Sequence, residues 1–154
     1  ENDFNYYKGC ILQAMGQNNE AQIFFQKACA GNNQPVAAMY YNDQKPDKVF
    51  YQGLALLKLG NEGKACSCFN RLIDFGEKHL FDIFKMDYFA VSLPDLQIWE
   101  DDMNRKNRVH CNYLMGLGHL GLGHVEKAKT YFGIASELDN NHQGVQIHSE
   151  MINE

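Results

Sequence analysis

The sequence has no run of basic residues and no long hydrophobic segment. Its 154 residues carry 14 Lys and Arg against 19 Asp and Glu, which gives a formal net charge of -5. Binding to the phosphate backbone of nucleic acids needs clustered positive charge, so this balance argues against a nucleic-acid partner. No segment approaches the roughly 18 apolar residues of a membrane-spanning helix, because glycines and His119 interrupt the most apolar stretch. The sequence therefore predicts a folded domain without a membrane span.

The cysteines form no regular framework of the kind found in small disulfide-rich proteins. Five are present, an odd number, at positions 10, 29, 66, 68 and 111, all in apolar surroundings. Reduced, buried thiols are the preferred interpretation, and they favour a cytoplasmic location. The chain begins at Glu1 without a charged and then apolar leader, so we expect it to be part of a longer protein. Export of that parent protein stays open as the alternative.

Three segments share one pattern of small and aromatic residues. In each, a glycine is followed seven positions later by a second glycine, then five later by an alanine and four later by a phenylalanine. The three series are Gly9, Gly16, Ala21 and Phe25; Gly53, Gly60, Ala65 and Phe69; and Gly116, Gly123, Ala128 and Phe132. These offsets fit an antiparallel helix pair, in which the first glycine allows close crossing and the second ends the first helix. We therefore expect the three phenylalanines to be buried at equivalent places.

This series resembles the tetratricopeptide repeat, a two-helix unit of about 34 residues. The resemblance implies an all-α fold, a right-handed α-solenoid of antiparallel helix pairs with a helical or loop insert and a C-terminal capping helix. We expect a single domain over residues 1–154. Its parts are repeat 1 at about 2–34, repeat 2 at about 46–79, an insert at about 80–105, repeat 3 at about 109–142 and the capping helix at about 143–153.

The insert is rich in aromatic residues, and we expect it to pack on the solenoid. Its segment 87–95, together with 107–111 and 117–123, resembles the C-terminal repeat region of large bacterial proteins that carry a domain of unknown function. In those proteins the repeats follow a β-sandwich similar to galactose mutarotase. The resemblance implies a bacterial parent protein, so the expected location becomes the bacterial cytoplasm.

Several residue groups could carry chemistry, and each has a simpler structural explanation. The run 116–121 has the glycine spacing of a dinucleotide-binding fingerprint, but it lies within an expected helix and not after a strand. Cys66 and Cys68 are too close in sequence for the usual zinc pair, and His119 and His124 flank a turn. We therefore expect no catalytic residue, no cofactor-binding residue and no metal site in this chain.

The remaining functional feature is the inner, concave surface of the expected solenoid. In tetratricopeptide repeats the first helix of each pair lines this surface and contacts peptides. Alignment by the crossing glycines places these partner-binding candidates there: Tyr6, Cys10, Phe50, Leu54, Tyr113 and Leu117. Tyr88 and Trp99 of the insert are second choices. The alternative is that the insert, or another domain of the parent, fills the groove and makes these residues part of the core.

The resemblance implies a non-catalytic scaffold for protein–protein or interdomain interactions, and not an enzyme. The expected partner is a protein, a peptide or another domain of the same parent chain, and the oligomeric state stays open. The alternative function is a supporting C-terminal region of a carbohydrate-binding or carbohydrate-active bacterial enzyme, whose catalytic part lies outside this chain.

Overall fold

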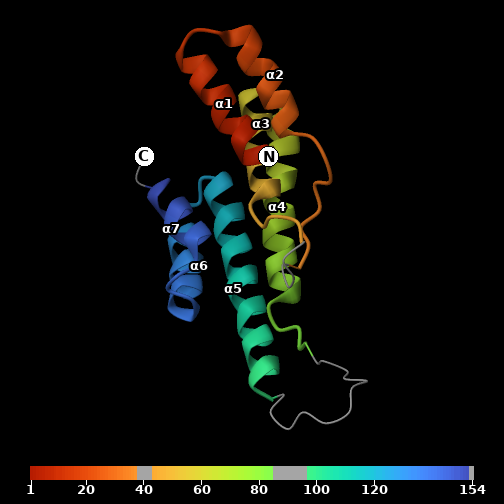
Figure 1. Ribbon diagram of the computed structural model, residues 1–154, viewed down its shortest axis with the longest axis vertical. Coiled ribbons are helices and arrows are strands. Elements are labelled where there is room, and N and C mark those ends of the chain that lie inside the picture. The colour runs from red at the N-terminus through yellow and green to blue at the C-terminus, as the bar shows by residue number, and fades with distance from the viewer. Residues whose placement is uncertain (38–42, 85–96, 153–154) are drawn as a thin grey trace.

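The protein is all-helical. The computed structural model describes residues 1–37, 43–84 and 97–152, with the side chains of 97–102 left out. Within these ranges there are seven helices and no strand, which confirms the predicted fold class. The helices are α1 (Asn2–Ala14), α2 (Asn18–Ala28), α3 (Lys48–Lys58), α4 (Glu62–His79), α5 (Gln97–Gly121), α6 (Val125–Leu138) and α7 (Gln143–Glu150), shown in Figure 1.

The same turn joins the two helices of each pair. Gly16 lies between α1 and α2, Gly60 between α3 and α4, and Gly123 between α5 and α6, with φ values of +79°, +74° and +75°. The residue after each glycine donates its N–H back to the first helix, as Asn61 does to the Leu56 carbonyl at 2.9 Å. Such a C-terminal motif needs a left-handed residue, which only glycine adopts without strain.

In each pair, one phenylalanine of the second helix packs against one glycine of the first helix. Phe25, Phe69 and Phe132 are buried, with at most 2% of each exposed. A Cβ atom on Gly9 would overlap the ring of Phe25, and Gly53 and Gly116 face the other two rings in the same way. The expected burial of the three phenylalanines at equivalent places is confirmed.

The pairs stack so that each first helix packs on the pair before it. α3 contacts both α1 and α2, and α5 contacts both α3 and α4. The long helices α4 and α5 lie side by side in Figure 1. Gly118 of α5 lies directly against the side chain of Ile73 and the carbonyl of Phe69 in α4. The glycine-rich run 116–121 therefore lies inside a helix, where its glycines allow close packing.

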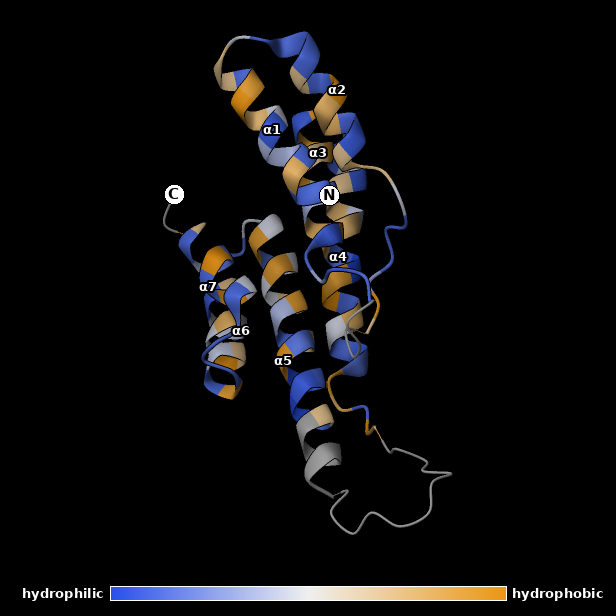
Figure 2. Ribbon diagram, viewed as in Figure 1, coloured by the Kyte–Doolittle hydropathy of each residue, from blue (hydrophilic) through white to orange (hydrophobic). Residues whose placement is uncertain are grey.

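The core consists of a large and a small cluster. The large cluster contains residues of all five helices from α3 through α7, among them Phe50, Phe69, Leu72, Tyr113 and Phe132. The small cluster joins α2 to α3 around Phe25. Figure 2 shows the amphipathic pattern that produces both, with hydrophobic and hydrophilic residues alternating around the helices.

Two described residues of the expected insert, Phe81 and Ile83, do not pack on the solenoid as predicted. Residues 97–105 belong to α5, which starts earlier than the repeat pattern indicates. Phe81 and Ile83, which follow the end of α4, are 83% and 73% exposed, because the chain leaves the helix pair there. Tyr88 and the side chain of Trp99 lie outside the described residues.

Candidate functional site

Three of the predicted partner-binding residues lie in the core. Phe50, Tyr113 and Leu117 are at most 2% exposed, which corresponds to the alternative of a filled groove, so their contact with a partner stays a prediction. For Phe50 and Tyr113, the physical reason for this burial is α7, whose His148 packs against both rings. The ring of His148 lies 5.4 Å from that of Phe50 and 5.8 Å from that of Tyr113. Helix α7, and not the described part of the insert, therefore fills this part of the groove.

The other three candidates are half-buried and contact the core. Tyr6 packs against Tyr51, with ring centroids 5.7 Å apart, and against Phe25 at 6.1 Å. Cys10 packs on the small cluster, and Leu54 on the large one. Their exposed parts remain candidates for contact with a partner.

A cleft remains open between α1, α3 and α7. We call it the α1–α3–α7 cleft, and its volume is about 590 Å³. It is lined by Asp3 and Tyr7 of α1, by residues 45–47, by Tyr51 of α3, by Tyr113 of α5, and by His142, Gln143, Gly144, Ile147 and His148 at α7. Segments from both ends of the chain thus meet at one concave place.

The cleft has a wall of aromatic rings. Neighbouring centroids are 5.5 Å apart for Tyr7 and Tyr51, 5.7 Å for Tyr51 and His148, and 5.8 Å for His148 and Tyr113. The ring of His142 continues the series at 4.7 Å from Tyr113. The hydroxyls of Tyr7 and Tyr51 form a hydrogen bond of 3.1 Å. Rings fixed in this way lose little entropy when a ligand binds against them.

His148 places a buried acceptor at the cleft. Its Nδ1 lies 2.7 Å from the Gly144 carbonyl oxygen, which can only accept, so Nδ1 carries the proton. The Tyr113 hydroxyl lies 3.1 Å from the same nitrogen. Nε2 is then an acceptor, and it has no hydrogen-bond partner although the side chain is 1% exposed. Burial lowers the pKa of His148, which keeps the ring neutral.

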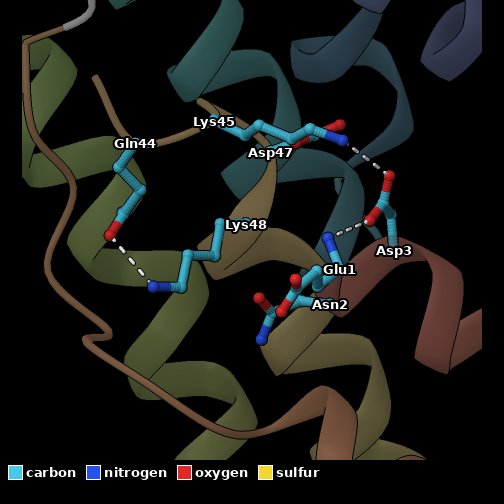
Figure 3. A pocket seen from close by; sticks show the side chains of 7 residues that line it. All are labelled: Glu1, Asn2, Asp3, Gln44, Lys45, Asp47 and Lys48. Atoms are coloured by element: carbon cyan, nitrogen blue, oxygen red, sulfur yellow. Dashed lines mark hydrogen bonds and ion pairs between the residues drawn. The ribbon is translucent and has the colours of Figure 1, made fainter. Parts of the chain in front are cut away.

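The charged residues lie at one end of the cleft. Lys45 Nζ pairs with Asp3 Oδ2 at 3.2 Å, as Figure 3 shows. Burial raises the pKa of Asp47, and the nearby positive charge of Lys45 acts in the opposite direction. An adjoining pocket of about 370 Å³, drawn in Figure 3, shares Asp3, Lys45 and Asp47 with the cleft. Asp47 is thus a half-buried carboxyl group whose ionised form a cationic ligand would stabilise.

Sequence reasoning missed most of these residues. Tyr7 and Tyr51 follow the predicted Tyr6 and Phe50 directly, so a shift of one position along each helix would have found them. No local signal brings His148 to these helices, because its place depends on where α7 packs.

No metal centre is evident in the described part of the chain. No group of three or more His, Cys, Asp and Glu residues there could hold a metal ion. Cys66 is exposed whereas Cys68 is buried. His119 and His124 do meet across the turn, with their Nδ1 atoms 3.3 Å apart, and His119 stacks on Tyr131. No described helix is long and apolar enough to cross a membrane.

Comparison with known proteins recovers two of the three helix pairs. Residues 3–30 and residues 49–74 each match a family model of the tetratricopeptide repeat. The matched segments cover α1–α2 and most of α3–α4, and α5–α6 repeats their glycine–phenylalanine contact outside the matches. No solved structure matches the chain significantly. The two matched segments are thus similar to tetratricopeptide repeats, and the described helix pairs stack in an α-solenoid.

Proposed function

We propose that this chain is a docking module that binds an extended protein segment carrying a Lys or Arg side chain in the α1–α3–α7 cleft. Tetratricopeptide repeats typically mediate protein interactions, which supports an interaction scaffold in general. The observation that carries the finer proposal is the half-buried carboxyl group of Asp47 in a cleft that His148, with its unpartnered and buried Nε2 atom, also lines. Both groups accept hydrogen bonds, so they match a ligand that donates them.

The surroundings of these acceptors favour a cation over a neutral donor. The ring of Tyr7, which is 43% exposed and lines the cleft, can offer negative π density to a positive group there. Lys45, which also lines the cleft, already pairs with Asp3. The chain as a whole carries a net charge of -5, which attracts basic segments.

A set of capped five-residue peptides tests the proposal. They differ only at the central residue, which is Arg, Lys, norleucine or Glu, and binding is followed by calorimetry and by NMR shifts. We expect the Arg and Lys peptides to bind, and the variants Asp47→Asn and Tyr7→Ala to weaken that binding about fivefold or more. Asp74→Asn is the matched control, because it removes one exposed carboxylate of α4 outside the cleft.

Two results would overturn the proposal. One is binding of the Glu peptide as tight as that of the Arg peptide, and the other is an equal effect of Asp74→Asn and Asp47→Asn.

The carbohydrate-related alternative concerns parts of a parent protein outside this chain and stays a prediction. For the compartment we propose the bacterial cytoplasm, which the unpaired state of all five cysteines supports.

A further inference from the structure

The outer face of α1 is apolar and uncovered. Phe4, Ile11 and Met15 lie on one side of the helix and are 66%, 61% and 67% exposed. We call these three residues the α1 outer face. Among the described helices, α1 contacts only α2 and α3, and α1 and α2 form one end of the stack in Figure 1. Single exposed hydrophobic residues are ordinary, but three on one side of a helix favour a contact surface.

The position of Ile11 is buried in the other two copies. Counted from the crossing glycine of each pair, Ile11 corresponds to Ala55 of α3 and to Gly118 of α5. Ala55 is fully buried in the small cluster with Phe25 of α2. Gly118 lies against the Phe69 carbonyl of α4. At both equivalent positions, the second helix of the preceding pair therefore covers the residue.

The positions next to Ile11 on this face are also covered in the other two copies. Met15 corresponds to Leu59 and Leu122, which pack against the small and the large cluster respectively. Lys8 corresponds to Gln52, whose side-chain amide donates to the Ala30 carbonyl at the end of α2, at 2.9 Å. Lys8 has no such preceding helix and lies over the ring of Phe24 instead.

We propose that the α1 outer face is the seat of a further antiparallel helix pair of the same kind, which precedes residue 1 in the parent protein. The structure has two interfaces between pairs, one where α3 packs on α1 and α2 and one where α5 packs on α3 and α4. In both, the pair that covers the first helix comes earlier in the chain. Terminal repeats of solenoids usually carry a polar outer face, whereas α1 exposes three large hydrophobic residues beside Lys8.

The side chains of the α1 outer face indicate which residues the covering helix must have. Ile11 is larger than Ala55 or Gly118, so the covering helix must offer a small residue opposite Ile11. The ammonium group of Lys8 can donate hydrogen bonds to the carbonyl groups at the C-terminal end of that helix. The side-chain amide of Gln52 donates in the same way to the Ala30 carbonyl after α2. The proposal does not depend on the α1–α3–α7 cleft, and the two can fail separately.

Hydrogen exchange and thermal unfolding test this proposal on the complete product of the gene and on residues 1–154 alone. We expect the α1 amides to exchange about tenfold or more slowly in the complete product. Ile11→Lys should shift the melting temperature of residues 1–154 by no more than about 1 °C, since the site is exposed there. In the complete product the same change should lower the melting temperature by several degrees and remove the added protection.

The matched control is Ile134→Lys on α6, which replaces another partly exposed isoleucine and should have the same small effect in both proteins. Equal α1 exchange in the two proteins would overturn the proposal, as would a neutral Ile11→Lys in the complete product. Concentration-dependent dimerisation of residues 1–154 that Ile11→Lys abolishes would also overturn it, because a second copy would then be the occupant.

Discussion

At the scale of single residues, each helix pair depends on a glycine that leaves room for a phenylalanine ring. Gly116→Ala places a methyl group where the ring of Phe132 lies, so we expect the free energy of unfolding to fall by about 1–3 kcal/mol. Gly133→Ala on α6 is the control, because nothing lies within 4 Å of its Cβ position. This change should stabilise the protein by up to about 1 kcal/mol through helix propensity. Denaturant unfolding of both variants provides the measurement.

The histidines make stability depend on pH. Burial lowers the pKa of His148, His110 and His142 below the ordinary value of 6.5. The folded protein therefore keeps them neutral, whereas the unfolded chain binds protons below about pH 6.5. Their contribution to stability is present above that pH and is lost as the pH falls through it. We expect the melting temperature to fall between about pH 7.5 and 5.5.

Replacement of His148 by Phe isolates one of these groups. His148→Phe keeps a ring beside Phe50 and Tyr113 but removes the titrating nitrogens. The pH slope of the unfolding free energy should decrease by up to about 1.4 kcal/mol per pH unit. An unaltered slope in His148→Phe would show that this ring is not held neutral by burial.

At the scale of helices, α7 closes the solenoid on the side of α3 and α5. Val145 and His148 of α7 are buried at 4% and 1% exposure. A chain that ends at Asp139 would leave Phe50 and Tyr113 uncovered, so we expect its melting temperature to fall by about 10 °C or more. The control is Ile147→Ala in the intact chain, because Ile147 is 52% exposed. Equal melting temperatures for the shortened and intact chains would contradict this function of α7.

The helix pairs could be predicted from the sequence, whereas the site could be predicted only in part. Gly53 and Phe69 make a contact within one pair, so their spacing carries the geometry of that pair. The burial of Phe50 and Tyr113 depends on α7, which comes from a distant part of the chain and covers them. The repeat pattern alone predicts an open groove, because it contains no information about α7. From this pattern, the two rings are therefore predicted to lie on a binding surface.

At the scale of the whole molecule, the two ends differ in how much core they hold. The end formed by α1 and α2 is held by the small cluster around Phe25, whereas α3 to α7 share the large cluster around Phe69. Solenoid stability is approximately a sum over repeats and the interfaces between neighbours. Helices α1 and α2, with one neighbouring pair and a small cluster, should therefore open before the rest of residues 1–154.

Two phenylalanine truncations in residues 1–154 distinguish this local opening from global unfolding. Phe25→Ala should raise the hydrogen-exchange rates of α1 and α2 about a hundredfold and leave those of α4 and α5 nearly unchanged. Phe69→Ala removes a ring from the large cluster, so the whole chain should lose about 3–5 kcal/mol of unfolding free energy. The rings are equivalent in the repeat, and only their place in the stack differs. Equal effects of both changes on α4 and α5 would mean that the chain unfolds as one cooperative unit, without a weaker end.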